Sequence, residues 1–471
     1  MRLQFTGALA LIALAGGCAA ERQDVALARA YGDVARRIVA AAEAGNDGWR
    51  KLEQLCDDVG HRLSGSPNLD RAIDWAAAAL AADGHENVRK QPVMIPKWVR
   101  GAESVEMLAP LPIDIPMLGL GGSVGTPPAG VEAEALSVAS EEDLTARASE
   151  AAGRIVLFDV PMPDDDEASG AGYGTAVRYR GAGADLAARH GAVAALVRSV
   201  TTRSMQTPHT GALRYRGDKR IPAAAITTEY AALITRLQQR GVPVRLRLKM
   251  QAHSADERVP SANVIGELVG SEKPAEVVVI GGHIDSWDVG QGAHDDGGGC
   301  VAAMEALTTL RRLGLRPRRT IRVVLFTNEE NGLAGGRKYA EDYADALPNH
   351  VAAIESDSGM FQVLGYGVSC EDKQREAVAV AQLQAICDIL SPLGKLTAKA
   401  GGGGADIGPM RPAGVPTLGQ RVDMTHYFDY HHTPADTLDK VDPKLLTQNI
   451  AAMAVTAYVL ADMPERLGSR P

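Results

Sequence analysis

The sequence has few cysteines, no excess of positive charge and no long apolar run after its N-terminal segment. Its 471 residues include five cysteines and carry a formal net charge of −9. Because nothing in this balance favours polyanions, nucleic acid is excluded as a predicted partner. No run of about 18 apolar residues follows the N-terminal segment, so no internal membrane span is predicted. No two cysteines have C-x-x-C spacing, which argues against a zinc site made of thiolates.

The remaining composition is ordinary for a soluble globular protein. Hydrophobic residues make up 45% of the chain and charged residues 23%, and the length suits two or three domains. Four cysteines lie beyond the N-terminal segment, and they allow three disulfide connectivities. The alternative is that they are buried free thiols, as the apolar surroundings of Cys300 suggest.

The N-terminal segment has the features of an export signal. Met1 and Arg2 precede an apolar run at residues 9–15, and small residues and Cys18 follow. Residues 14–18 resemble a bacterial lipobox, although Ala15 stands where leucine is usual. We therefore expect residues 1–20 to direct export, either of a periplasmic or cell-envelope lipoprotein anchored through lipid at Cys18 or, after ordinary cleavage at Ala20, of a secreted protein.

Histidine and acidic residues follow an apolar run in the second half of the chain. Residues 277–280 are β-branched and bounded by glycine, which is typical of a strand buried on both faces of a parallel sheet. His283 and Asp285 come directly after it, and Asp295 follows on a glycine-rich turn. Open α/β sheets bind their ligands at the carboxyl ends of strands, so this arrangement predicts a metal site there.

The same pattern recurs downstream. Residues 321–326 precede Glu329 and Glu330, and residues 351–354 precede Asp357. His432 comes later, in a segment rich in polar residues. Apolar strands therefore deliver carboxylates to one edge of one sheet, and a late loop adds a histidine.

Five motifs carry a resemblance to a known family. H-x-D, G-x-x-D-D-G-G-G, N-E-E, E-S-D-S-G and H-T-x-x-D-T occur in this order. This order resembles the co-catalytic di-zinc aminopeptidases, a family that includes bacterial leucyl aminopeptidase and the glutamate carboxypeptidases. Residues 282–299 most resemble its carboxypeptidase Q branch, and the match runs from about Asn46 to the C-terminus. Five motifs in order are far more specific than any one of them.

The resemblance implies a fold and a division into domains. We expect an α/β zinc-exopeptidase fold, with a mixed, mostly parallel sheet flanked by helices. Residues 21–130 and 254–471 would form the catalytic domain. Residues 131–253 contain strands and helices but no ligand motif, and they resemble an inserted protease-associated domain. In relatives such a domain shapes the cleft or a dimer, so a homodimer is one alternative for the assembly.

The resemblance also assigns roles to single residues. It implies two zinc ions with terminal ligands and a bridging carboxylate, and their four positive charges would be balanced by three carboxylates and one hydroxide. The implied terminal ligands are His283, Glu330, Asp357 and His432, and the implied bridge is Asp295. Glu329 would be the general base. Asp285 would accept a hydrogen bond from the second nitrogen of His283 and fix its tautomer.

Three further expectations concern neighbouring residues. Consecutive residues in an extended segment face opposite ways, so only one of His431 and His432 would bind metal, and the motif match selects His432. The Asp295–Asp296 peptide would be cis, as in relatives. Asp406 ends the glycine run at residues 401–404 and could contact a substrate amine; the alternative is a flexible surface loop.

The predicted function is hydrolysis of dipeptides or short peptides with a free amino terminus by an exported di-zinc exopeptidase. Glutamate carboxypeptidase action is one alternative and needs a basic pocket, for which Arg411 and Arg421 lie in a suitable region. Acyl transfer of the glutaminyl cyclase kind is another, with one zinc. A non-catalytic binding protein is the third, but every motif residue is present here.

Overall fold

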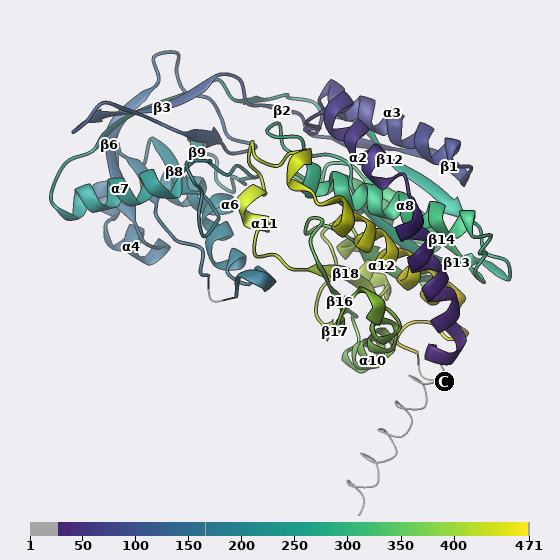
Figure 1. Ribbon diagram of the computed structural model, residues 1–471. Coiled ribbons are helices and arrows are strands. Elements are labelled where there is room, and N and C mark those ends of the chain that lie inside the picture. The colour runs from purple at the N-terminus through teal and green to yellow at the C-terminus, as the bar shows by residue number, and fades with distance from the viewer. Residues whose placement is uncertain (1–26, 165, 470–471) are drawn as a thin grey trace, which may run out of the picture.

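The computed structural model describes residues 27–164 and 166–469. The predicted export signal at residues 1–20 and the lipidation site Cys18 lie outside these residues. Within them the chain forms two lobes, each built around an eight-stranded sheet, and a two-stranded sheet lies between the lobes (Figure 1).

The sheet of the first lobe is mixed, with a parallel centre. Its strands in spatial order are β1 (Glu86–Ile95), β12 (Val259–Leu268), β14 (Arg319–Phe326), β13 (Lys273–His283), β15 (His350–Glu355), β18 (Thr417–Val422), β16 (Val363–Ser369) and β17 (Thr397–Ala400). The pairs β14–β13, β13–β15 and β15–β18 are parallel, whereas β1–β12 and β12–β14 are antiparallel. The predicted mixed, mostly parallel sheet is confirmed.

Helices cover both faces of this sheet. One face packs against a helix at residues 27–44 and against α2 (Gly48–Glu53), α3 (Pro67–Ala82), α8 (Gly298–Arg312), α10 (Lys373–Ile389) and α12 (Pro443–Asp462). The other face packs against α9 (Ala334–Asp342) and the short helix η6 (Gly408–Ala413). In β13, Val278 and Ile280 join the first core and Val277 and Val279 the second. Successive strand residues point to opposite faces, which explains why this strand is apolar at every position.

Helix α12 is apolar because it is a core helix. It is long and apolar enough to cross a membrane by length and composition, but 72% of its apolar window is buried inside the protein.

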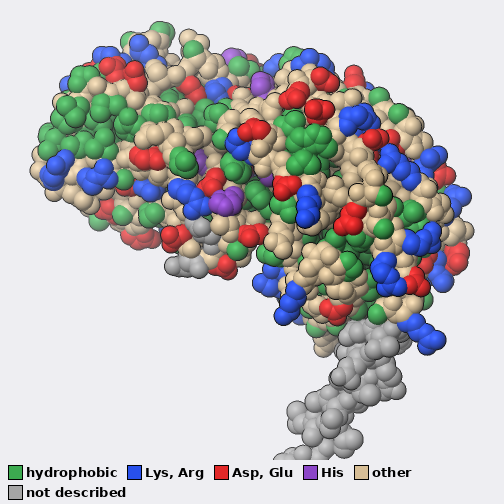
Figure 2. Space-filling model, viewed as in Figure 1, with side chains coloured by type: hydrophobic (Ala, Val, Ile, Leu, Met, Phe, Trp, Pro, Cys, Tyr) green, Lys and Arg blue, Asp and Glu red, His purple; other side chains and the backbone are tan. Residues whose placement is uncertain are grey.

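The cysteines are buried as well: Cys56, Cys300, Cys370 and Cys387 are all free thiols. The surface in Figure 2 intermixes Lys and Arg with Asp and Glu across both lobes.

The second lobe begins earlier in the chain than the predicted boundary at residue 131. Its strands in spatial order are β4 (Ile113–Ile115), β3 (Glu103–Ala109), β10 (Arg245–Met250), β6 (Val131–Val138), β7 (Ile155–Phe158), β8 (Ala194–Arg198), β9 (Ala223–Ile226) and β5 (Met117–Gly119). The segment before residue 131, which we assigned to the catalytic domain, thus supplies three strands of the second sheet. Val105 and Met107 of β3 alternate into the core of this lobe, where Leu246 and Leu248 of β10 also lie.

Among the described residues, four α-helices, the short helix η2 (Glu167–Ser169) and a small two-stranded sheet complete the second lobe and its connection. The α-helices are α4 (Glu141–Ala146), α5 (Ala148–Ala151), α6 (Tyr173–Arg189) and α7 (Thr228–Gln239). The chain enters and leaves the lobe side by side, because β2 (Trp98–Val99) pairs with β11 (His253–Ser254). Helix α11 (Tyr427–Tyr430) follows β18 of the first lobe and lies beside α6 of the second (Figure 1). Tyr173 of α6 stacks on Phe428 of α11 at a centroid distance of 5.1 Å.

A buried ion triad joins α2, the end of α3 and α8. The Lys51 ammonium forms ion pairs with Asp83 and with Glu305, and the side chains of Lys51 and Glu305 are buried.

Lys51→Ala would leave Glu305 buried without a cation, so we expect the free energy of unfolding to fall by about 3–5 kcal/mol. Guanidinium chloride unfolding measures this change. The exposed pair Arg36–Asp33 offers a control, and an equal loss in Arg36→Ala would contradict the prediction.

Candidate metal centre

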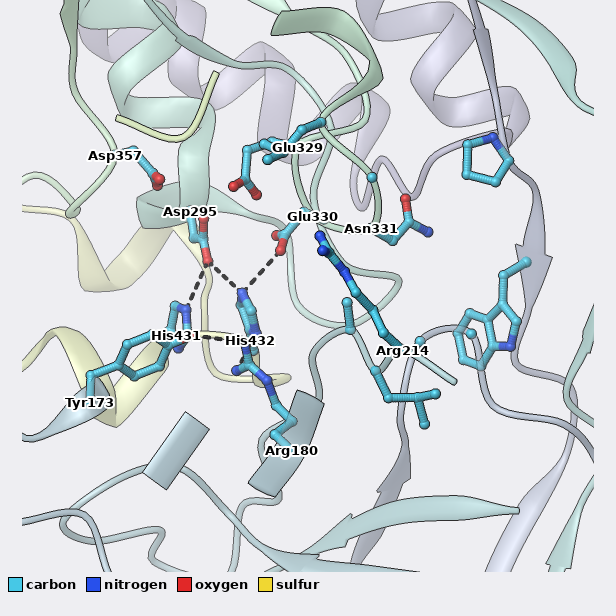
Figure 3. Close-up of a pocket in the computed structure, with 18 of the residues that line it drawn as sticks. Tyr173, Arg180, Arg214, Asp295, Glu329, Glu330, Asn331, Asp357, His431 and His432 are labelled. Carbon is cyan, nitrogen blue, oxygen red and sulfur yellow. Dashed lines mark hydrogen bonds and ion pairs between the residues drawn. The ribbon is translucent and has the colours of Figure 1, made fainter. Parts of the chain in front are cut away.

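The predicted ligands meet at the carboxyl ends of the central strands. His283 is the last residue of β13, Glu330 follows β14, and Asp357 follows β15. Asp295 lies in the kinked segment η3 (Ala293–Gly297), where its own backbone angles, φ −125° and ψ 86°, are not helical. His432 follows α11. All five predicted ligands come together, and Figure 3 shows the carboxylates of Asp357, Asp295 and Glu330 directed toward one space with His432. The peptide between Asp295 and Asp296 is cis, as predicted.

Asp295 lies at the centre of this cluster. Its Oδ1 is 3.2 Å from Nε2 of His283, and its Oδ2 is 3.3 Å from Nε2 of His432. The His283 Nε2 atom is also 3.4 Å from Oδ1 of Asp357. The His432 Nε2 atom is 3.0 Å from Oε2 of Glu330. The cluster therefore consists of two half-sites, each with one imidazole and one carboxylate, and Asp295 offers one oxygen to each.

The second nitrogen of each imidazole faces a backbone carbonyl. Nδ1 of His283 is 3.0 Å from the carbonyl oxygen of Asp285. Nδ1 of His432 is 3.2 Å from the carbonyl oxygen of Thr210, which belongs to the second lobe. An Nδ1–H that donates to a carbonyl leaves the Nε2 lone pair for a metal. The second lobe thus helps to orient a histidine of the first.

The structure corrects the predicted contact of Asp285. Its Oδ1 is 3.8 Å from Nδ1 of His283, too far for a hydrogen bond. The carboxylate instead accepts hydrogen bonds from the backbone N–H groups of Glu329, at 3.0 Å, and Glu330, at 3.4 Å, and from the Ser64 hydroxyl at 3.0 Å. The chain turns after β13, so the backbone carbonyl of Asp285 reaches the imidazole and its side chain turns to the Glu329–Glu330 segment.

The expectation that His431 and His432 face opposite ways is wrong. His432 has φ +62°, so the segment is not extended and the alternation rule does not apply. The two rings stack with centroids 3.6 Å apart. The Nε2 atom of His431 is 3.7 Å from Oδ2 of Asp295, farther than that of His432, and only His432 also contacts Glu330.

Asp406 does not lie where a substrate contact would require. It is fully buried and does not line the cavity at the cluster. Both its carboxylate oxygens lack a hydrogen-bond partner. Burial and the neighbouring Glu355 raise the pKa of Asp406 well above its usual range. The glycine run does allow close approach, because a Cβ atom on Gly404 would lie 2.1 Å from Oε2 of Glu355.

Two residues with a part in the site received no role from the sequence. The carboxylate of Asp436 accepts hydrogen bonds from the N–H groups of His294, at 2.8 Å, and Asp295, at 3.1 Å. Asp436 is the acid of the H-T-x-x-D-T motif, so a signal was present. Arg62 is fully buried and donates to the carbonyls of Ile284, at 2.7 Å, and Gln291, at 2.7 Å. No motif marks Arg62.

The cluster forms the floor of a cavity of about 490 Å³ between the lobes. The first lobe contributes acids and the aromatic residues Tyr427 and Phe428. The second lobe contributes Tyr173, Arg180 and Arg214. The lining includes neither Arg411 nor Arg421, the two arginines that the sequence suggested for a basic pocket.

Burial and mutual contacts shift the pKa values of the cluster. Burial and the nearby Asp295 raise the pKa of Glu330 to about 7. Burial alone would lower the pKa of His432, but Glu330 and Asp295 outweigh it and raise the value to about 9. Burial and Asp357 raise the pKa of Glu355 to about 8. The folded protein therefore retains protons here that the unfolded chain would release.

The donor set fits divalent cations. Asp295 Oδ2 and Glu330 Oε1 are buried and lack a hydrogen-bond partner. Buried polar atoms without partners are rare in native proteins and indicate an ion or water. Imidazole nitrogens and carboxylate oxygens are ligands that zinc accepts. The negative charge of the carboxylates, the geometry of the cluster and the unpartnered oxygen atoms all indicate a site for metal cations.

The pKa shifts predict how the stability of the ion-free protein depends on pH. His432 titrates at about 9 when folded and Glu330 at about 7, above their ordinary values of 6.5 and 4.5. Where the folded state binds more protons than the unfolded state, stability falls as pH rises. We therefore expect the thermal midpoint of the ion-free protein to fall between about pH 7 and pH 9; below pH 6.5 buried histidines with a lowered pKa, such as His294 and His350, act in the opposite direction. Burial alone would raise the pKa of Asp295, but contacts with His283 and His432 hold it well below its usual range. Asp295 therefore affects the pH dependence of stability only below this range.

Zinc binding must displace these protons, so its effect should grow with pH. The increase in thermal midpoint on adding Zn²⁺ to chelator-treated protein should be larger at pH 9 than at pH 6. Thermal unfolding with and without Zn²⁺ across this range measures it. An increase that does not change with pH would contradict the assignment of His432 and Glu330.

Comparison with known proteins agrees with the site. A sequence model of Peptidase family M28 matches residues 263–457. Carboxypeptidase Q of Mus musculus is 43% identical over 93% of this chain and 91% of its own length. Carboxypeptidase Q of Homo sapiens is 42% identical over 93% of this chain and 90% of its own.

Solved structures share the fold. The crystal structure of a Peptidase M28 precursor from Shewanella amazonensis SB2B matches with a TM-score of 0.88 at 37% identity, over 94% of this chain and 99% of that chain. BSAP, a zinc aminopeptidase from Bacillus subtilis, matches with a TM-score of 0.64 at 18% identity, over 89% of this chain and 96% of that chain, which shows a shared fold. The order of motifs, the extent of the match and the geometry of the cluster lead to one conclusion: the chain belongs to peptidase family M28.

Proposed function

We propose that the protein is a di-zinc exopeptidase that hydrolyses dipeptides and short peptides with a free amino terminus. The observation that carries this proposal is the position of Asp295, with one carboxylate oxygen at each of two histidines. A carboxylate between two imidazoles is suited to bridge two metal ions. BSAP, a structural neighbour, is a zinc aminopeptidase, which supports the choice of metal.

Each half-site would hold one zinc ion. His283 and Asp357 would bind one ion, His432 and Glu330 the other, and Asp295 would bridge them. Bound zinc would supply Lewis acidity, which polarises a scissile carbonyl and makes water more acidic. The protein's own contribution is to hold these ligands before metal arrives, through Asp436 behind Asp295 and through the two carbonyls behind the imidazoles.

Glu329 is the proposed general base. Glu329 and Glu330 both line the cavity, but only Glu330 contacts the His432 imidazole, at 3.0 Å. Figure 3 shows the carboxylate of Glu329 facing the same space as Asp295 and Asp357. Burial and the nearby acids raise the pKa of Glu329 well above its usual range, although His283 opposes this. A carboxylate with a raised pKa takes a proton from water and later returns it to the leaving amine.

The charge of the cavity floor supports recognition of a substrate amine. Two zinc ions would balance the charges of Asp295, Glu330 and Asp357, so the carboxylate of Glu329, which also lines the cavity, is the negative charge that attracts an ammonium group. A cavity of about 490 Å³ is small beside a long peptide and suits a short one.

Carboxypeptidase action is the second candidate. Relatives that match nearly the whole chain bear the name carboxypeptidase Q. The basic residues that would favour it here are Arg180 and Arg214 of the second lobe, which take the place of the predicted Arg411 and Arg421.

The proposal also includes location and assembly. Residues 1–20 would direct export, with lipid attachment at Cys18. The second lobe would be a protease-associated domain that closes one side of the cleft, and it would also be the surface for a homodimer.

The two adjacent glutamates provide a matched pair of variants. Glu329→Gln removes the proton acceptor but no ligand, so kcat should fall by about 10²- to 10⁴-fold with zinc content unchanged. Glu330→Gln makes the same chemical change one residue later and should lower zinc content as well as activity. Kinetics and metal analysis of both variants measure the difference. Equal zinc loss in the two variants would show that the roles are wrongly divided.

Substrate blocking tests the direction of attack. We expect hydrolysis of Leu-Leu, negligible hydrolysis of N-acetyl-Leu-Leu, and two zinc ions per active chain. Chromatography of the products and metal analysis give these values. Efficient cleavage of the acetylated peptide would support carboxypeptidase action, and full activity at one zinc per chain would support a mononuclear reaction of the glutaminyl cyclase kind.

A further inference from the structure

The imidazole of His294 is buried behind the proposed bridging ligand. His294 comes directly before Asp295 in the chain, and it is not one of the residues that line the cavity. Both its ring nitrogens have backbone partners. Nδ1 lies 3.0 Å from the backbone nitrogen of Met360, and Nε2 lies 3.1 Å from the carbonyl oxygen of Lys440. Neither nitrogen is therefore left for a metal ion or a substrate.

The two hydrogen bonds fix one tautomer of this imidazole. A backbone N–H can only donate, so the Nδ1 lone pair accepts from Met360. A backbone carbonyl can only accept, so Nε2 carries the ring proton and donates it to Lys440. A neutral imidazole offers one acceptor and one donor, and the two partners use both. The planar ring thus holds two separate backbone segments at a fixed distance from each other.

Aromatic rings hold the plane of the imidazole. The Phe361 ring is stacked on that of His294 with centroids 4.4 Å apart and an angle of 3° between the planes, and the Tyr430 ring lies 5.6 Å away at 8°. Gly359 has φ +78°, and a Cβ atom there would lie 2.6 Å from the Phe361 ring and 3.0 Å from Nδ1 of His294. Glycine at this position therefore allows the backbone to come close to the imidazole.

His294 contacts two of the segments that carry proposed ligands and belongs to a third. Met360 lies in the segment that begins with Asp357, and Lys440 lies in the segment that contains His432. In its own segment the next residue is Asp295. These three ligands are the bridge and one ligand of each half-site, and Figure 3 shows them around one space.

The contribution of the ring differs from that of the backbone. The Asp436 carboxylate already joins the segment of His432 to the backbone N–H groups of His294, at 2.8 Å, and Asp295, at 3.1 Å. The ring adds the connection to the segment of Asp357, through the N–H of Met360. The imidazole thereby ties the two half-sites to each other across the bridging carboxylate.

We infer that His294 is a positioning residue that sets the separation of the two half-sites and so allows two metal ions to bind at the same time. This inference rests on the proposed function. A bridging carboxylate serves two ions that are about 3.5–4 Å apart, so the segments on either side of Asp295 must keep their places. Hydrogen-bonded groups behind metal ligands change metal affinity by about 10- to 100-fold.

His294→Phe removes the two hydrogen bonds and keeps an aromatic ring for stacking. Chelator-treated protein is titrated with Zn²⁺ in a calorimeter, and bound zinc per chain is measured. The wild type should bind two ions, and the variant should bind the second ion about 10- to 100-fold more weakly. Loading with Co²⁺ gives a spectroscopic readout. Two Co²⁺ ions that share a carboxylate couple magnetically, and the electron paramagnetic resonance spectrum of the variant should lose this coupling.

Two smaller variants separate the two hydrogen bonds. His294→Asn places an amide near the position of Nδ1 and can still accept from Met360, whereas His294→Gln places it near Nε2 and can still donate to Lys440. Both lose the aromatic ring, so they differ in the segment to which they remain connected. Because Asp436 already holds the segment of His432, His294→Asn should bind the second zinc ion more tightly than His294→Gln. The reverse order would overturn the inference.

His350→Phe is the matched control. His350 is also buried, and its ring donates to the Ala346 carbonyl at 3.0 Å and accepts from the Tyr339 hydroxyl at 2.9 Å. It begins β15, whereas the site lies beyond the other end of that strand. His350→Phe should lower the thermal midpoint, as His294→Phe does, and leave the affinity for both zinc ions unchanged.

The outcomes separate this inference from the proposed function. Wild-type affinity for the second ion in His294→Phe would overturn the positioning role and leave the proposed function standing. An equal loss of affinity in His350→Phe would do the same, because it would show a general effect of destabilisation. A wild type that binds only one zinc ion would overturn the proposed di-zinc function itself.

Discussion

The buried carboxylate of Asp295, held between two imidazoles, is the interaction on which the site depends. Its two oxygens lie 3.2 Å from His283 and 3.3 Å from His432. Its backbone N–H is held by Asp436, so the position of the carboxylate is built into the loop. A group of buried acids and histidines without cations is costly, and the raised pKa values of Glu330 and His432 express that cost as retained protons.

The two lobes form one functional unit. The Thr210 carbonyl of the second lobe faces the imidazole of His432, and Arg180 and Arg214 form the wall opposite the acidic floor. Thr210 contacts His432 through its backbone N–H and its backbone carbonyl. These contacts do not depend on which side chain residue 210 carries. A lobe without any of the five ligand motifs thereby influences both the metal centre and the shape of the cavity. This arrangement explains why the site lies in a cleft and not on an open sheet edge.

Much of the fold could be predicted because its causes are local. Apolar runs buried on both faces predicted the central strands, and the acids after them predicted the edge at which the site lies. The predictions that failed required knowledge of chain direction after a turn. Asp285 uses its backbone carbonyl for His283 and its side chain for the Glu329–Glu330 segment. The positive φ of His432 brought two rings to the same side. The boundary at residue 131 missed β3 and β5, whose partners β10 and β9 come more than 100 residues later.

The sequence by itself determined the family, the central strands and the residues that would gather at their ends, because periodicity and motif order are properties of short segments. Only the tertiary structure decided which groups orient those residues. Thr210 and His432 are 222 positions apart, and Arg62 reaches carbonyls more than 220 positions away. Such contacts depend on where folded segments come to rest against one another, and backbone carbonyls, which every residue carries, leave no mark in the amino-acid sequence.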